Sequence, residues 1–160
     1  MITPITDRDR EKILRLLKQT GVFNEKEIEV AMEIADQVLA KRDRGDYQTF
    51  CYYDGENRFR GYICFGPIPM TDSRYDLYWI AVDKQARGKG VAAELVGFME
   101  EEIAKQGGGK IYVDTSSTPQ SGAARAFYAK QGYSRVCALD DFYRKGDSKI
   151  IFMKDIDALR

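Results

Sequence analysis

Histidine is absent from this sequence of 160 residues. Without it, neither a Ser-His or Cys-His nucleophile pair nor a zinc site built on histidine can form. Any proton transfer carried out by this protein must therefore use carboxylates, tyrosine, lysine, cysteine or water.

The sequence also lacks a surplus of either charge, because 25 lysine and arginine residues balance 25 aspartate and glutamate residues. A net charge of zero provides no overall attraction to nucleic acid or to anionic lipid, so we expect neither as a partner. No run of about eighteen apolar residues occurs, and residues 1–4 do not begin an apolar signal segment. We therefore expect a cytoplasmic protein in which any anion-binding site is local.

Cysteine is scarce, with residues only at Cys51, Cys64 and Cys137. Their surroundings are apolar and typical of strands, and their spacing does not match a set of metal ligands. We expect all three to be reduced residues of the core, and we expect no bound metal.

The residues that are present fit one soluble domain spanning residues 1–160. Hydrophobic residues make up 44% of the chain and charged residues 31%, which is typical of globular proteins. A chain of this length can bury a substantial core. No repeat, linker or low-complexity segment divides it.

Two helices are predicted at the start of the chain, because Thr6 with Asp9 and Asn24 with Glu27 have the spacing of capping boxes. The basic run 41–44 is expected to end the second helix. Further helices are predicted at 88–106 and 121–131, and strands at 49–53, 60–65, 75–82, 110–114, 133–139 and 149–154, with a break at 66–69 and a charged aromatic loop before the last strand. This order predicts an α/β (α+β) fold with a mixed sheet.

The most informative segment is 80–92, where a predicted strand runs through a short turn into an amphipathic helix. Gly88 and Gly90 let the backbone approach a ligand, and the first N–H groups of a helix have no internal partner. Together they can bind phosphate oxygens, with Arg87 and Lys89 adding positive charge. The alternative is that the glycines only permit a tight turn. Asp83 is expected to cap this turn.

Two motifs carry a resemblance to a known family. Arg87-x-x-Gly90-x-Ala92, after the predicted strand, resembles the pyrophosphate-binding signature of the GCN5-related N-acetyltransferases (GNAT superfamily). Ala126-Phe127-Tyr128-Ala129-Lys130-Gln131-Gly132-Tyr133 resembles the pattern that ends the fourth helix of that superfamily. Segments 77–83 and 141–147 resemble, more narrowly, enzymes that acetylate the N-terminal alanine of a ribosomal protein, although Ser121 replaces their usual asparagine.

This resemblance implies a GNAT-like fold, with a mixed, mostly antiparallel sheet of about six or seven strands and about four helices. It also implies acetyl-CoA as co-substrate, held in a wedge between the strands that end at Val82 and near Asp114. The backbone groups of residues 80–82 would hydrogen-bond the pantetheine arm and place an N–H group near the thioester carbonyl. The residues expected to bind the coenzyme are Ile80, Ala81, Val82, Arg87, Gly88, Lys89, Gly90, Val91, Ala92 and Ser121.

Tyr128 matches the tyrosine that, in the superfamily, faces the coenzyme sulfur and helps the thiolate to leave. A tyrosine has an ordinary pKa of about 10, against about 8.5 for a cysteine-like thiol, so full proton transfer is mildly uphill. We therefore expect a strong hydrogen bond as its main contribution. The alternative is a core tyrosine that packs the fourth helix, as Phe127 does.

The attacking amine must lose a proton, and Asp114 is the first candidate for its base. It ends the strand where alanine-acetylating relatives have a glutamate, and its shorter side chain would act through water. The alternative is that Asp114 caps its loop, since Asp-Thr-Ser-Ser favours a turn. Asp76 is the second candidate base. Tyr78 and Tyr143 are candidates to line the acceptor pocket, and the loop 66–70 is expected at its rim.

The predicted function is transfer of the acetyl group of acetyl-CoA to a primary amine by direct attack in a ternary complex. The acceptor can be a small molecule or a peptide N-terminus. Two other functions stay open: an inactive acyl-CoA-binding sensor or partner module, and a nucleotide-binding protein. The resemblance also leaves a homodimer open.

Overall fold

The computed structural model describes residues 1–41 and 45–159. The described residues form one seven-stranded sheet in the order β1-β2-β3-β4-β5-β7-β6, flanked by four α-helices. The strands are β1 (Ile2–Pro4), β2 (Gln48–Tyr53), β3 (Phe59–Pro67), β4 (Arg74–Val82), β5 (Gly109–Ser116), β6 (Ser134–Arg144) and β7 (Asp147–Ile156), and the helices are α1 (Arg10–Thr20), α2 (Glu25–Lys41), α3 (Val91–Lys105) and α4 (Gly122–Lys130). Among the strands of the described residues, only β4 and β5 pair in parallel, so the predicted mixed, mostly antiparallel sheet is confirmed.

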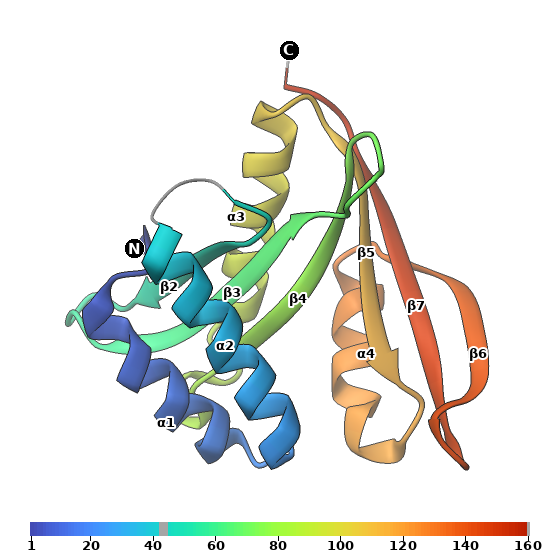
Figure 1. The fold of residues 1–160 in the computed structure, drawn as a ribbon, viewed down its shortest axis with the longest axis horizontal. Coiled ribbons are helices and arrows are strands. Elements are labelled where there is room, and N and C mark those ends of the chain that lie inside the picture. Colours follow the sequence, from blue (N-terminus) through green and yellow to red (C-terminus); the bar gives the residue numbers. More distant parts are fainter. Residues whose placement is uncertain (42–44, 160) are drawn as a thin grey trace.

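The helices cover both faces of the sheet, α1 and α2 on one face and α3 and α4 on the other (Figure 1). Each face has its own apolar core. Strand β3 serves both cores, because Tyr62 and Cys64 point toward α1 and α2 while Ile63 and Phe65 point toward α3. This alternation explains why a short apolar strand is buried on both sides.

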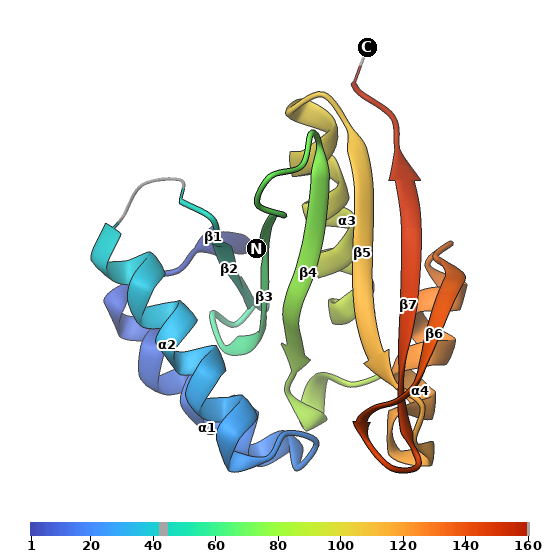
Figure 2. The same cartoon turned by 45° about the vertical axis from the view of Figure 1, so that its right-hand side comes forward.

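The parallel strands β4 and β5 pair only over four residues each, Arg74–Leu77 of β4 with 110–113 of β5. On the other side of β4, Cys64 pairs with Trp79 and Phe65 with Leu77, so Tyr78 is an extra residue in β4. Such a bulge bends its strand. Figure 2 shows the result: β4 and β5 run side by side and then diverge toward their C-terminal ends.

Several predicted boundaries are wrong. Helix α3 begins at Val91 instead of Gly88, because Gly88 (φ 76°) and Gly90 (φ 81°) have left-handed backbone. The break expected at 66–69 comes later, since β3 includes Pro67 at its end. Most of the loop expected between the last two strands belongs to β6, which runs to Arg144. Residues 42–44 of the expected helix end lie outside the described residues, and α2 extends to Lys41.

The cysteine prediction is correct for two residues and wrong for the third. Cys51 and Cys64 are buried, whereas Cys137 is exposed. The reason is its position on β6, an edge strand that is exposed along its whole length. None of the described helices is long and apolar enough to cross a membrane. The described residues also contain no cluster of acidic, cysteine or histidine side chains suited to a metal ion.

Candidate functional site

A cleft of about 510 Å³ opens where β4 and β5 separate. Its walls come from β4, β5 and α4, from the connection between α1 and α2, and from the β6–β7 hairpin. The lining residues are Thr20, Val22, Phe23, Glu27, Leu77, Tyr78, Trp79, Ile80, Ala81, Val82, Arg87, Ala92, Val113, Asp114, Thr115, Ser116, Ser121, Ala124, Phe127, Tyr128, Tyr143, Arg144 and Asp147. Segments far apart in the sequence therefore meet at one cleft.

One wall of the cleft is a strand edge with free backbone groups. Residues 80–82 of β4 pair with 61–63 of β3 on one side. On the other side, the pairing of β4 with β5 ends at Leu77, within the part of the chain that the structure describes. Unpaired N–H and C=O groups at a strand edge can bind an extended ligand much as a neighbouring strand would.

The turn between β4 and α3 is closely fixed by hydrogen bonds. The Asp83 carboxylate accepts from the backbone N–H of Gln85 at 2.8 Å and caps the 3-10 helix η2 (Lys84–Ala86), as expected for this residue. The N–H groups of Arg87 and Lys89 donate to the carbonyls of Lys84 (3.4 Å) and Ala86 (3.3 Å). These two N–H groups are therefore used inside the turn.

Helix α3 supplies free donors beside this turn. Its first internal hydrogen bond runs from the N–H of Glu94 to the carbonyl of Gly90, at 2.9 Å. The N–H groups of Val91, Ala92 and Ala93 precede that bond and have no partner one turn back. Ala93 was not among the predicted residues, because the sequence pattern places the helix start three residues too early.

The predicted coenzyme residues divide into two groups. Five of them line the cleft through β4, the turn and α3: Ile80, Ala81, Val82, Arg87 and Ala92, and Ser121 lines it from the start of α4. Four do not line it: Gly88, Lys89 and Gly90 are exposed on the turn, and the Val91 side chain is buried in the core.

Tyr128 belongs both to the core and to the cleft. Its side chain is 5% exposed and its ring packs against those of Phe127, Tyr133 and Phe152. It also lines the cleft from α4, so the two roles weighed from the sequence are compatible. Burial raises the pKa of Tyr128, so its hydroxyl keeps its proton at neutral pH.

The two candidate carboxylates lie close together. Asp114 lines the cleft, and its Oδ2 is 3.1 Å from the ammonium of Lys149. Burial and the neighbouring Asp114 carboxylate raise the pKa of Asp76 to about 6, while Lys149 acts in the opposite direction. The cap of the loop after β5 comes from Ser116 instead of Asp114, because the Ser116 hydroxyl accepts from the N–H of Thr118 at 3.1 Å.

The other end of the cleft is aromatic and acidic. Tyr78 and Tyr143 line it, as expected for acceptor residues. The rings of Phe23 and Trp79 pack edge to face at 5.2 Å. Burial raises the pKa of Tyr143, and carboxylates from three elements, Asp114, Asp147 and Glu27, raise it further. Three carboxylates therefore surround the Tyr143 hydroxyl, and two of them are also paired with Lys149 and Arg144.

The sequence assigned no site role to four residues of this end: Phe23, Glu27, Arg144 and Asp147. Asp147 holds the hairpin to β5, since it accepts from the Ser116 hydroxyl at 2.5 Å and from Arg144 at 2.6 Å. Arg144 and Asp147 belong to segment 141–147, whose resemblance to alanine-acetylating enzymes gave only Tyr143 a role. The capping box of Asn24 and Glu27 was a local signal for a helix start, and nothing in the sequence marked Phe23.

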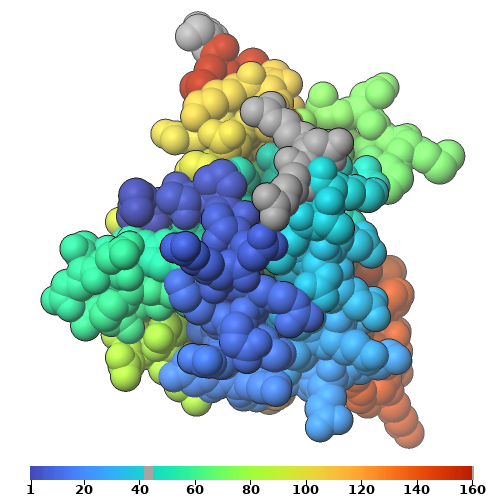
Figure 3. Space-filling model, turned by 60° about the vertical axis from the view of Figure 1, so that its left-hand side comes forward, coloured from blue at the N-terminus to red at the C-terminus, as the bar shows by residue number. Residues whose placement is uncertain are grey.

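The loop 66–70, expected at the rim, does not line the cleft. This segment comprises the end of β3 and the start of the connection to β4, whereas the cleft opens along the second half of β4. Figure 3 shows this connection (light green) and the β6–β7 hairpin (orange-red) at opposite ends of the molecule. The expectation is therefore wrong, because strand direction separates the two ends of β4.

Comparison with known proteins agrees with this architecture. A family model described as the acetyltransferase (GNAT) family matches residues 11–133. A crystal structure from Desulfovibrio desulfuricans, of a protein ascribed to the GNAT family of acetyltransferases, is 30% identical, with a TM-score of 0.92 over 98% of each chain. A comparison with curated proteins finds no significant match.

Two structures of lower identity share the fold. The Escherichia coli ribosomal-protein-S18-alanine N-acetyltransferase is 15% identical, with a TM-score of 0.77 over 100% of this chain and 96% of the other. An aminoglycoside 6'-N-acetyltransferase in complex with coenzyme A is 18% identical, with a TM-score of 0.73 over 100% of this chain and 99% of the other. Since the family model covers most of the sequence, the chain belongs to the acetyltransferase (GNAT) family.

Proposed function

We propose that this protein transfers the acetyl group of acetyl-CoA to a primary amine within a ternary complex. The cleft between β4 and β5 carries the proposal, because one continuous cavity joins a free strand edge, a helix N-terminus and a buried tyrosine. The crystallised relative with coenzyme A, which shares the fold, supports the choice of coenzyme.

The residues of the cleft fit the parts of acetyl-CoA. The free edge of β4 at Ile80, Ala81 and Val82 suits the extended, amide-containing pantetheine arm. The turn with Gly88, Lys89 and Gly90 and the free N–H groups at the start of α3 suit the pyrophosphate, because both are preferred sites for anions. Arg87 adds a positive charge on the same side. Ser121 faces the cleft from the start of α4.

Asp114 is the proposed proton acceptor for the amine, acting through a water molecule. It lines the cleft, and Asp76 lies beside it with a raised pKa of about 6. Burial and the negative charge of Asp114 make Asp76 hold a proton more tightly than a lone aspartate does. A carboxylate with such a raised pKa is a better base near neutral pH than an ordinary aspartate, which keeps Asp76 as the second candidate.

Tyr128 is the proposed hydrogen-bond donor to the departing sulfur. Its burial keeps the hydroxyl protonated, and it lines the cleft from α4. Because a raised pKa makes full proton transfer less favourable, we assign it a hydrogen bond instead of a complete transfer.

The test is release of free thiol from acetyl-CoA in the presence of amines of different classes: a peptide N-terminus, an amino sugar and an alkyl diamine. Turnover with at least one class supports the proposal. Tight binding of acetyl-CoA without turnover across the panel contradicts it and favours the alternative, an acyl-CoA-binding module. Competitive binding of ATP without any need for pantetheine favours a nucleotide-binding protein.

A further inference from the structure

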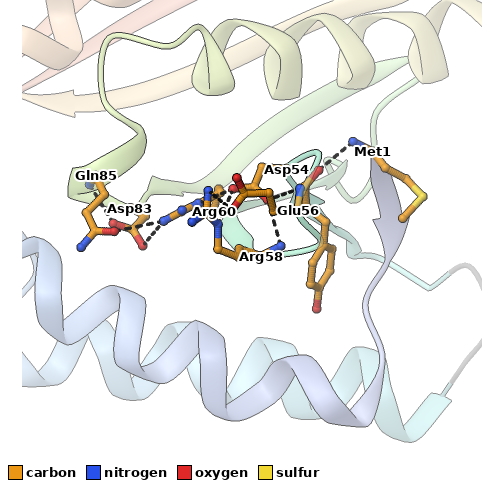
Figure 4. Close-up of polar contacts among 8 residues, drawn as sticks. Met1, Asp54, Glu56, Arg58, Arg60, Asp83 and Gln85 are labelled. Atoms are coloured by element: carbon orange, nitrogen blue, oxygen red, sulfur yellow. Dashed lines mark hydrogen bonds and ion pairs between the residues drawn. The ribbon is translucent and has the colours of Figure 1, made fainter.

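Arg60 is a buried charged residue outside the cleft. It lies on β3 and is 8% exposed. A buried guanidinium is tolerated only when its donors are paired. Its Nε donates to Asp54 at 2.8 Å, and its Nη1 lies 3.4 Å from both Asp83 and Gln85 (Figure 4). The side chain thus connects the β2–β3 hairpin to the segment that follows β4.

Asp83 is held by Arg60 in two ways. Besides the side-chain pair, the backbone N–H of Asp83 donates to the Arg60 carbonyl at 2.8 Å. The carboxylate of Asp83 has one oxygen on Arg60 and the other on the N–H of Gln85. The ion pair with Arg60 and the cap of η2 therefore share the Asp83 carboxylate. A shift of the Arg60 side chain is thereby coupled to the position of η2.

The turn after Asp83 is fixed at its far end as well. Ala86, the last residue of η2, is buried in the core with α3. Strands β3 and β4 also meet closely here, because a Cβ on Gly61 would lie 2.7 Å from the Ala81 carbonyl oxygen. Between these two fixed points, the chain leads directly into 87–90 and the free donors of α3.

Asp54 holds Arg60 from the outer side. Its hydrogen bond with Arg60, together with bonds from Arg58 and Glu56, keeps the pKa of Asp54 well below its usual range. Arg58 binds the same carboxylate at 3.0 Å but is exposed and does not reach Asp83. Of the two arginines, only Arg60 connects this hairpin to the turn.

We propose that Arg60 is a positioning residue for the coenzyme, which fixes the turn at Asp83 and so directs the N–H groups at the start of α3 toward the pyrophosphate of acetyl-CoA. This inference rests on the proposed function. Its effect is specific to the pyrophosphate, since Arg60 touches neither the acceptor end nor the edge of β4 that faces the cleft.

The experiment compares Arg60→Met with Arg58→Met, which removes the other arginine of Asp54. For Arg60→Met we expect KM for acetyl-CoA to rise about tenfold while kcat stays within about twofold. With S-acetylpantetheine, which lacks the pyrophosphate, KM should not change. Arg58→Met should leave both substrates unaffected. An equal loss with both substrates, no loss with either, or the same loss in Arg58→Met overturns the proposal.

Hydrogen exchange separates this inference from the proposed function. Without any coenzyme, Arg60→Met should speed amide exchange at 84–90 relative to the wild type, while exchange in the β6–β7 hairpin is unchanged. Unchanged exchange at 84–90 overturns the positioning role even if the enzyme is active. If Arg60→Met does not fold, Asp83→Asn, which removes the charge facing Arg60, should give the same substrate-dependent rise in KM, and its absence overturns the inference.

Discussion

At the scale of single residues, Tyr128 combines a core position with access to the cleft. Replacing Tyr128 by Phe keeps the ring and removes only the hydroxyl. We expect kcat to fall by about 100-fold, because a fixed hydrogen-bond donor to the charge that develops in the transition state contributes on that order. The affinity for acetyl-CoA, measured by calorimetry, should stay within about twofold, because the free strand edge and the helix N-terminus are intact.

Tyr133→Phe is the matched control for that substitution. Tyr133 packs against Tyr128, but its hydroxyl donates to Glu100 at 3.1 Å and it does not line the cleft. This variant should lose about 1 kcal/mol of stability from the missing hydrogen bond and keep its kcat. Equal losses of kcat in the two variants would contradict the role given to Tyr128.

The carboxylate pair predicts a pH dependence. Because the pKa of Asp76 is about 6, kcat at saturating amine should rise as the pH increases through about 6. Asp76→Asn removes this titrating carboxyl, so the inflection near pH 6 should disappear. An unchanged inflection in Asp76→Asn would show that another group controls the rate.

At the scale of elements, the junction between the turn and α3 should depend on Gly90. Its φ of 81° is strained for any residue with a Cβ, although the space around it is open. Gly90→Ala should therefore cost about 1 kcal/mol and weaken acetyl-CoA binding several-fold, as the backbone shifts to relieve the strain. Thermal unfolding and calorimetry measure the two effects.

Gly97, in the middle of α3, provides the comparison. It also has open space for a Cβ, and no positive φ is recorded there. Gly97→Ala should raise stability by about 0.5 to 1 kcal/mol and leave coenzyme binding unchanged. Equal affinities in the two variants would mean that the left-handed turn does not help to bind the coenzyme.

Sequence motifs predicted the helix starts correctly where the hydrogen bonds join residues close together in the sequence. Thr6 and Asp9 form the expected capping box, with the Thr6 N–H donating to Asp9 at 2.7 Å. Asn24 and Glu27 exchange two bonds of 2.8 Å. The three-residue strand β1 was missed, because its pairing with β2 is a contact distant in sequence. No periodicity marks so short a segment.

The sequence predicted the site residues that lie within a continuous motif. It did not predict those that only the fold brings to the cleft. The segment 80–92 and Tyr128 lie on local patterns, and most of their residues line the cleft. Phe23, Arg144 and Asp147 reach the same cleft from opposite ends of the chain. They line one cleft because the fold brings the connection between α1 and α2 and the β6–β7 hairpin to the same end of β4 and β5.

At the scale of the whole molecule, Asp76 makes stability depend on pH. Its pKa is about 6 in the folded protein against 3.8 ordinarily, so the folded state holds the proton more tightly. The resulting stabilisation is present below pH 3.8 and is lost as the pH rises through about 6. Because Asp76 is half-buried and screened, we expect Asp76→Asn to gain only about 1 kcal/mol at pH 8.

Urea unfolding of Asp76→Asn and wild type at pH 3.5 and pH 8 checks this expectation. The difference between the two proteins should be present at the higher pH and nearly absent at the lower. A difference that does not change with pH would mean that the substitution acts through packing instead of charge.

Binding of acetyl-CoA in the cleft between β4 and β5 can be measured by calorimetric titration of the purified protein with acetyl-CoA and, separately, with ATP. We predict binding of acetyl-CoA in the micromolar range and much weaker binding of ATP, because ATP has no pantetheine arm for the free edge of β4. Absence of acetyl-CoA binding would contradict the proposed coenzyme site. Segment 87–92 would then be only a turn between a strand and a helix.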